Sequence, residues 1–395
     1  MNIKLFDQEK ITLKVNNSAE VTMTDEEINK KYREGEIRIV TEQARYPLNT
    51  ISSLISKDNY KMNPEYQRRH RWSNKKRSTL IESLIMNVPL PPVFLYEYDY
   101  SSYEVMDGLQ RLTAISSFYD NKFALEGLTK WPELNNKRYF ELPKLVKQGI
   151  DRRHISSIIL LNETAKTPEQ AETLKQMVFD RINSGGEKLE PQEKRNANFD
   201  GKLNRLCMKL SENESLCKTW GIPLHIEGDE DIHSVRSANK LFKTMYDVEL
   251  VLRFFAYRQK HSLHIGALEG YLDKYLEKGN YFTDETLEKL ADLFNRTIDL
   301  VYKIFEEQAF YMFRERKGRW SWYERPTVAV YDSMMLVISQ NIDSKDILIE
   351  QKSEIQAEIE ILYKKNYEAF GGRNVNESAL IVRENLLTDF IAKFI

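Results

Sequence analysis

Residues 93–119 have the sequence pattern of a β-hairpin that is followed, after a glycine, by a helix. This stretch constrains the fold more than any other. Two runs rich in aromatic and β-branched residues flank the polar segment 99–102, as in a β-hairpin. After Gly108 the apolar residues recur at helical spacing through Tyr119. The sequence therefore predicts a compact α+β unit built around this junction.

The junction carries an acid, an amide and a base, at Asp107, Gln110 and Arg111. The first amide N–H groups of a helix lack partners within the helix and favour a bound anion, and Gly108 lets the backbone approach such a ligand closely. Arg111 can add a two-pronged contact to a phosphate, while Asp107 can hold Mg²⁺ or orient a water. We expect these side chains at an exposed junction. Asp-Gly is also common in ordinary turns, so a turn with a surface ion pair is the alternative.

Three stretches in order resemble the GmrSD-type restriction family. Asp107-Gly-Leu-Gln-Arg111 is similar to the family's Asp-Gly-Gln-Gln-Arg motif, and Asn63-Pro-Glu-Tyr-Gln-Arg68 with Trp72 is similar to its Pro-x-Tyr-Gln-Arg-x-x-x-Trp segment. The third stretch, 179–189, resembles the family's Phe-x-x-(Leu/Ile)-Asn-x-Gly-Gly-x-x-Leu segment, and Glu193, Arg195 and Asn196 follow it. Two positions depart from the pattern, with Leu109 in place of the usual Gln and Arg69 in place of a frequent Pro. The first departure puts one ligand contact in doubt.

This resemblance implies a ParB/sulfiredoxin-like α+β domain that binds a nucleoside triphosphate with Mg²⁺ and serves restriction of modified phage DNA. It implies catalytic roles for Asp107, Gln110 and Arg111, with Asp107 as the metal ligand. The residues expected to bind the nucleotide are Tyr66, Gln67, Arg68, Gly108, Arg111, Asn183 and Gly185. The expected domains are an N-terminal extension at 1–45, the ParB-like nucleotide-binding domain at 46–200, and a mainly α-helical domain at 201–395.

The run from Gln67 to Arg77 holds six Lys or Arg residues and no acid. Either it is a solvated basic loop, or Gln67 and Arg68 face the Asp107 turn while the rest contacts DNA phosphates. The residues predicted to bind DNA are Arg69, Arg71, Lys75, Lys76 and Arg77. Likewise, Gly185 and Gly186 either only stop a helix or form a loop that closes over the same ligand.

Around these motifs the sequence predicts secondary structure. In the first half we expect a capped helix after Thr24, helices at 51–55 and 169–182, a helix from the N-cap Ser73 to the left-handed residue Asn87, a helix starting at Pro191, and further strands at 61–66, 123–125 and 157–161. Beyond residue 200 we expect helices at 239–260, 283–308, 327–340 and 344–363.

The connector 314–325 mixes five basic residues with Trp320, Trp322 and Tyr323. Aromatic rings among cations can stack bases or follow a nucleic-acid backbone. The alternative, burial of the two tryptophans between helices, is favoured.

Composition excludes several classes of protein. A net charge of −2 argues against a protein that coats nucleic acid over its whole surface. The two cysteines are not spaced as a metal site, which favours a reducing cytoplasm. The most apolar run, 84–96, contains three prolines and is no membrane span, and no signal peptide is expected. P-loop, α/β-hydrolase and zincin motifs are absent from the sequence.

The leading hypothesis is a Mg²⁺-assisted module that binds and hydrolyses a nucleoside triphosphate in a phage-defence system. GmrSD-type proteins usually continue into a His-Asn-His nuclease domain, and no such segment occurs here, so DNA cleavage is expected to need a separate nuclease partner. The alternatives are a ParB-like domain that itself cleaves DNA, and a non-enzymatic adaptor for DNA or a partner protein. The sequence leaves room for a homodimer.

Overall fold

The structure, a computed structural model, divides into two compact units, residues 17–189 and residues 1–16 with 190–395. We call the first the sheet unit and the second the helical unit. The residues described are 3–12, 23–34, 39–62, 72–161, 163, 167–183, 190–225, 235–259, 268–370 and 377–395. Within these ranges, no helix combines the length and the apolar character needed to cross a membrane.

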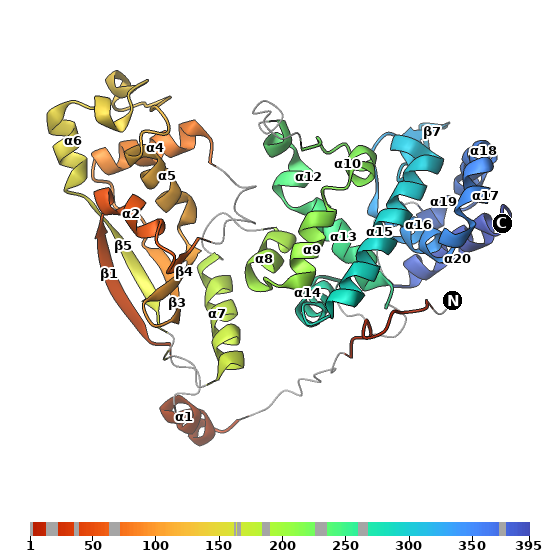
Figure 1. Cartoon of the computed structure of the whole chain (residues 1–395), viewed down its shortest axis with the longest axis horizontal. Coiled ribbons are helices and arrows are strands. Elements are labelled where there is room, and N and C mark those ends of the chain that lie inside the picture. The colour runs from red at the N-terminus through yellow and green to blue at the C-terminus, as the bar shows by residue number, and fades with distance from the viewer. Residues whose placement is uncertain are drawn as a thin grey trace. The chain divides into compact units, whose positions relative to one another are not determined.

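Among the described residues of the sheet unit, five strands form one mixed sheet (Figure 1). The strands are β1 (Thr41–Pro47), β2 (Tyr60–Lys61), β3 (Val93–Asp99), β4 (Ser102–Asp107) and β5 (His154–Leu160), in the order β1-β5-β3-β4-β2. β3 and β4 form the predicted antiparallel hairpin, while β5 lies between β1 and β3 and pairs parallel with β3. The hairpin therefore occupies the interior of the sheet and holds its last residue, Asp107, in a fixed frame.

Helices cover both faces of this sheet. They are α2 (Ile51–Ile55), α4 (Asn74–Ile85), α5 (Leu109–Tyr119), α6 (Lys144–Asp151) and α7 (Pro168–Asn183), whereas α1 (Asp25–Glu34) is an exposed helix that does not cover the sheet. Val93, Leu95 and Val105 face one way, into a core shared with α2, α4 and α5. On β4 the neighbouring side chain of Glu104 pairs with Lys175 of α7 at 2.8 Å, so α7 lies against the opposite face.

The predicted start and end of the helix α4 are confirmed. The Ser73 side chain caps α4 by accepting from the Lys76 amide at 3.3 Å, and Asn87 after the helix is left-handed, with φ of 59°. The predicted strand at 123–125 is wrong, because Leu125 forms its backbone hydrogen bonds with the neighbouring loop residues 136 and 137. The sequence also missed β1, a largely exposed polar strand that crosses the end of the expected extension at residue 45.

The helical unit confirms a mainly α-helical second half after the α+β first half. Its helices are α8 (Pro191–Asn198), α9 (Lys202–Leu210), α10 (Glu214–Trp220), α12 (Lys240–Lys243), α13 (Tyr246–Tyr257), α14 (Leu268–Gly279), α15 (Asp284–Phe305), α16 (Val328–Gln340), α17 (Lys345–Glu350), α18 (Lys352–Lys365), α19 (Tyr367–Phe370) and α20 (Glu377–Ile391). The predicted helix 239–260 is interrupted at Met245, with φ of 57°, and the helix 344–363 is divided at Gln351. In place of a connector, β6 (Met312–Arg316) and β7 (Arg319–Tyr323) form a hairpin.

The chain enters the helical unit twice, because residues 3–12 pack there before the chain continues into the sheet unit. Glu9 is fully buried and accepts two hydrogen bonds from Arg258, at 2.7 and 2.9 Å. Gln259 donates to the backbone carbonyl of Glu9 at 2.6 Å and accepts from the amide of Ile11 at 2.9 Å. The compact units therefore differ at their edges from the expected ranges 1–45, 46–200 and 201–395, which remain a prediction about domains.

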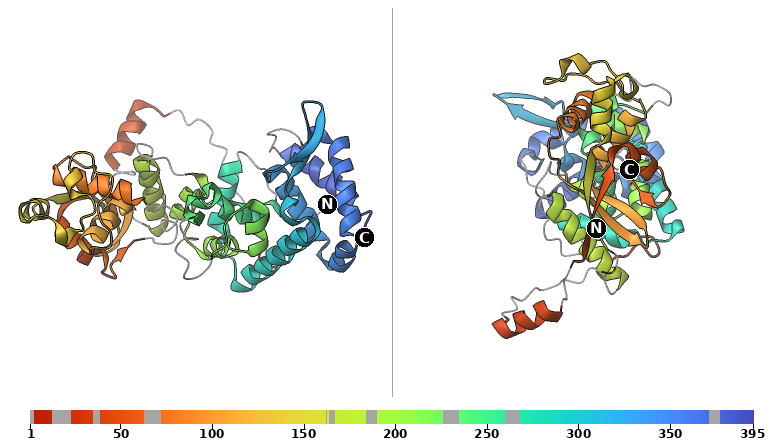
Figure 2. Two further views of the ribbon diagram at one scale, coloured as in Figure 1. Left: turned by 90° about the horizontal axis from the view of Figure 1, so that it is seen from above. Right: turned by 90° about the vertical axis from the view of Figure 1, so that its left-hand side faces the viewer.

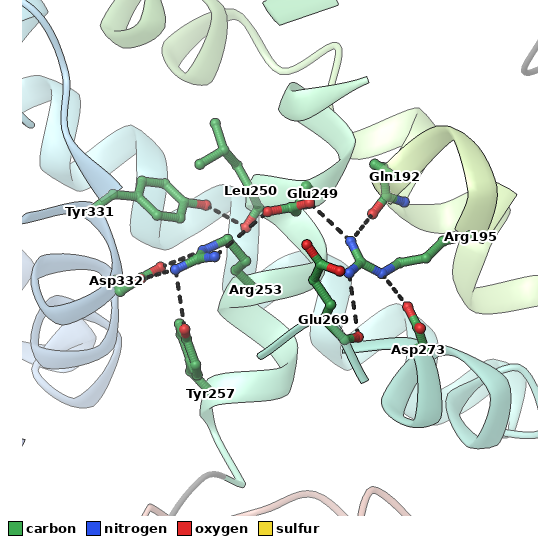
Figure 3. A network of polar contacts seen from close by, with 10 residues as sticks. All are labelled: Gln192, Arg195, Glu249, Leu250, Arg253, Tyr257, Glu269, Asp273, Tyr331 and Asp332. Carbon is green, nitrogen blue, oxygen red and sulfur yellow. Dashed lines mark hydrogen bonds and ion pairs between the residues drawn. The ribbon is translucent and has the colours of Figure 1, made fainter. Parts of the chain in front are cut away.

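Two arginines organise the interior of the helical unit (Figure 3). Arg195 of α8 donates to Asp273 of α14 at 2.7 Å and to Glu249 of α13 at 2.9 Å. Glu249 also lies 3.6 Å from Arg253, which pairs with Asp332 of α16. Burial opposes the charge on Arg253, but the Asp332 carboxylate together with Tyr257 and Glu249 outweighs burial and raises the pKa of the guanidinium. One charged network therefore joins four helices across the unit.

Removing Arg195 should destabilise the helical unit, because its side chain is only 2% exposed and its loss leaves Glu249 without that partner. Arg195→Ala is expected to lower the free energy of unfolding by about 3 kcal/mol, the lower end for a broken buried pair because Asp273 can turn to water. Urea denaturation measures this. The control is Arg205→Ala, whose exposed pair with Asp200 should contribute at most about 1 kcal/mol. Equal losses in the two variants would contradict a structural role for the network.

Candidate functional site

The turn between β4 and α5 is tightly packed. Gly108 has a φ of 96°, a left-handed conformation, and a Cβ added there would lie 2.5 Å from Cγ1 of Val93. Just before it, the hairpin register pairs Phe94 with Asp107 but Leu95 with Val105, so Met106 is the extra residue of a β-bulge. Sterics at Gly108 and the bulge together fix where Asp107 points.

The Arg111 side chain is hydrogen-bonded within the turn and largely buried. Its guanidinium donates to Asp107 at 2.7 Å, to the carbonyl of Pro92 at 3.2 Å, and to the carbonyl of Pro91. The Arg111 side chain is 11% exposed, whereas that of Asp107 is 39% exposed. Burial lowers the pKa of the Arg111 guanidinium, an effect that the Asp107 carboxylate opposes. The expectation that both side chains lie at an exposed junction is therefore wrong for Arg111.

The other residues of the motif face the interior as well. The Gln110 side-chain oxygen accepts from the backbone amide of Trp72 at 3.3 Å, which ties the start of α5 to the segment before α4. Leu109 is 7% exposed and packs in the core of the sheet unit. A leucine at this position therefore contributes packing and offers no polar group to a ligand.

Two of the predicted DNA-binding cations remain at the surface on the first turns of α4. Lys75 and Lys76 are exposed, and the Lys76 ammonium lies 4.9 Å from the ring centre of Trp72. A shallow groove of about 470 Å³ is lined by Trp72, Ser73, Lys75, Lys76, Thr79, Leu80 and Ser83. Arg77 instead turns inward, with its guanidinium 4.6 Å from the ring centre of Phe123. The exposed cations thus adjoin the Trp72 backbone that Gln110 holds.

Other predicted site residues cannot be placed. Tyr66, Gln67, Arg68, Arg69, Arg71 and Gly185 lie outside the described residues. Asn183 is the last residue of α7, and only its backbone is described. The described part of the chain contains no cluster of three or more His, Cys, Asp or Glu side chains placed to hold a metal. The metal role of Asp107 and the nucleotide roles of Asn183 and Gly185 remain predictions.

One pair near the turn could not be anticipated from the sequence. Glu104, three residues before Asp107, and Lys175 are 15% and 16% exposed in their ion pair, and the Lys175 ammonium also lies 5.7 Å from the Tyr96 ring centre. No periodic pattern links these residues, because they come from separate elements. The pair anchors α7, the helix that leads to Asn183, against the strand that leads to Asp107.

The fold and the turn define a class: an α+β unit in which a bulged strand passes through glycine into a helix start, with a fixed acid and base beside exposed cations. Residues 51–199 match the family model described as "GmrSD restriction endonuclease, N-terminal domain". This region is therefore similar to the N-terminal domain of the GmrSD-type restriction family, as the resemblance predicted. The match concerns the domain as a whole, and a functional equivalence of Asp107–Arg111 with the family motif remains a prediction. No curated protein and no solved structure matches the chain.

A methyl group at Gly108 should disrupt this turn. Gly108→Ala combines a left-handed backbone, which costs other residues about 1–2 kcal/mol, with an overlap on Val93 of the overpacking kind, about 1–3 kcal/mol. We expect the free energy of unfolding to fall by roughly 2–5 kcal/mol in urea denaturation. Gly149→Ala in α6 is the matched control, since nothing lies within 4 Å of its added Cβ and alanine favours a helix. Similar stability of the two variants would show that the contact with Val93 is unimportant.

Proposed function

We propose that the sheet unit binds a nucleoside triphosphate with Mg²⁺ at the Asp107–Arg111 turn and hydrolyses it, as one component of a restriction system that acts on DNA with a separate nuclease. The observation that carries this proposal is the packing of Gly108 against Val93, which holds the start of α5 and Asp107 in one fixed arrangement. The match of residues 51–199 to a restriction endonuclease domain supports the restriction context.

The side chains at the turn fit such a ligand. Asp107 uses Oδ2 to bind Arg111, and within the described residues its Oδ1 makes no hydrogen bond, which leaves an oxygen of the type that Mg²⁺ prefers. Arg111 has five N–H donors, of which the contacts with Asp107, Pro91 and Pro92 use three. The first amides of α5, which have no partner within the helix, would face the phosphates.

The three groups would have different roles. The helix start and Arg111 would position the triphosphate. They would also stabilise the negative charge on the phosphate oxygens in the transition state. Asp107 would hold the ion, whose contribution when bound is to neutralise phosphate charge and activate water. Lys75 and Lys76, beside the Trp72 backbone held by Gln110, would attract the same anion.

A second candidate function, a non-enzymatic adaptor for DNA or a partner protein, is favoured by the burial of Arg111. Its three contacts tie the loop at Pro91 and Pro92 to the start of α5, a sufficient structural reason for an arginine at this position. In that case the turn is a rigid corner of the fold. Calorimetry of the purified chain with each of the four common nucleoside triphosphates and Mg²⁺ separates the two functions. Failure of the wild type to bind any of them would favour the adaptor.

Asp107→Asn should separate binding from hydrolysis. The amide keeps the shape and still accepts from Arg111, so the dissociation constant should change little, while the loss of charge should slow hydrolysis roughly 100-fold or more. Phosphate release and calorimetry measure the two effects. Asp99→Asn, at the exposed far end of the same hairpin, is the control and should leave both unchanged. Hydrolysis at the wild-type rate by Asp107→Asn would show that Asp107 is only a turn residue.

A further inference from the structure

The hairpin of β6 and β7 projects beyond the helices of its own unit (Figure 2). Its strands are joined by a two-residue turn, Lys317 and Gly318, with φ values of 53° and 76°. Two positive φ values match the twist of the strands, so the turn is built to hold a rigid ribbon. The tip of the hairpin therefore has a defined backbone conformation.

One face of the hairpin carries three aromatic rings, which pack on the helices beneath it, and the exposed Glu315 nearer the tip. Phe313 and Trp322 are directly opposite each other across the strands, with ring centres 5.2 Å apart, and Trp320 stacks on Phe313 at 5.9 Å. Trp322 also contacts Tyr363 of α18 edge-on and donates from its indole nitrogen to Glu360 at 3.2 Å. The favoured interpretation of the connector, burial of the two tryptophans between helices, is confirmed only in part, because both side chains pack on α18 and α19 but stay half-buried.

The other face is basic. Successive residues of a strand alternate between faces, so the register places Arg314, Ser321, Arg316, Arg319 and Tyr323 opposite to the tryptophans. The guanidinium of Arg314 lies over the ring of Tyr323 on this face, 3.7 Å from the ring centre. Arg316, Arg319 and the turn residue Lys317 are exposed.

The cations at the tip repel one another. Arg316 and Arg319 are direct cross-strand partners, an arrangement of like charges that costs stability. Neither these arginines nor Lys317 forms an ion pair with any acid in the described parts of the chain. This concentration of positive charge stands on a chain whose net charge is −2. A bound polyanion would relieve the repulsion.

We propose that the β6–β7 hairpin is a docking element for double-stranded DNA, with Arg316, Lys317 and Arg319 contacting backbone phosphates. A two-stranded ribbon fits the major groove of B-DNA in width. The choice of DNA as the polyanion rests on the proposed function in restriction. Single-stranded DNA is disfavoured, because the tryptophans that would stack on bases are already packed against helices.

The test uses the full chain and a fluorescent duplex of random sequence, with affinity measured by anisotropy between about 50 and 200 mM salt. In the triple variant Arg316→Gln, Lys317→Gln, Arg319→Gln, the slope of log affinity against log salt should flatten by about 2–3 units, at about 0.9 per lost phosphate contact. Because the three side chains are exposed and removal of both arginines relieves their repulsion, the thermal unfolding midpoint should not fall.

The control removes the same charge from exposed positions elsewhere in the helical unit, as Lys274→Gln, Lys303→Gln, Lys345→Gln. It should keep the wild-type slope, and equal flattening in both triple variants would show an effect of net charge and overturn the proposal. Failure of the wild type to bind duplex, or tighter binding to single strands that the hairpin variant retains, would also overturn it. Nucleotide affinity, measured on the same samples, reports separately on the function proposed for the sheet unit.

Discussion

The contact between the Gly108 backbone and Val93 is the constraint on which the sheet unit depends. It brings the first turn of α5 against the central strand of the sheet, closer than any side chain at position 108 would permit. From that placement follow the burial of Leu109, the reach of Arg111 to the carbonyls of Pro91 and Pro92, and the tie between Gln110 and Trp72. The same contact therefore stabilises the core and shapes the candidate site, where hydrogen bonds join Arg111 to Asp107 and to the proline loop.

The helical unit is organised by charge where the sheet unit is organised by close packing. Breaking a buried ion pair is costly because the remaining charge keeps its desolvation penalty without its partner. Arg195 shows how this bears on the family resemblance. It lies in the matched region 51–199, yet its side-chain hydrogen bonds within the described parts of the chain go to residues of the helical unit, Gln192, Glu249, Asp273 and the carbonyl of Glu269. Its role in the structure is thus to anchor α8, and similarity of sequence extends past the edge of the compact sheet unit.

Local chemistry was predictable from the sequence, and long-range partners were not. The Ser73 cap, the left-handed Asn87, the β3–β4 hairpin and the helix start after Gly108 each follow from a few neighbouring residues. The burial of Arg111 could not be predicted, because it depends on carbonyls of a distant proline loop. β1 was missed because a polar, exposed edge strand lacks the apolar alternation that identifies strands. β6 and β7 do carry an alternation, of rings and cations, but its period of two was hidden among the many charges of the segment.

The buried carboxylate of Glu9 has a consequence for the order in which the protein can assemble. On the ribosome, residues 3–12 emerge early, whereas Arg258, Gln259 and Thr286, which bind Glu9, Ile11 and Asp7, emerge only after the entire sheet unit. The described strands and helices of the sheet unit are complete once Asn183 has been made, so this unit can fold while translation continues. Residues 3–12 must therefore wait for these partners, and their docking is a late, long-range closure that follows the synthesis of the sheet unit.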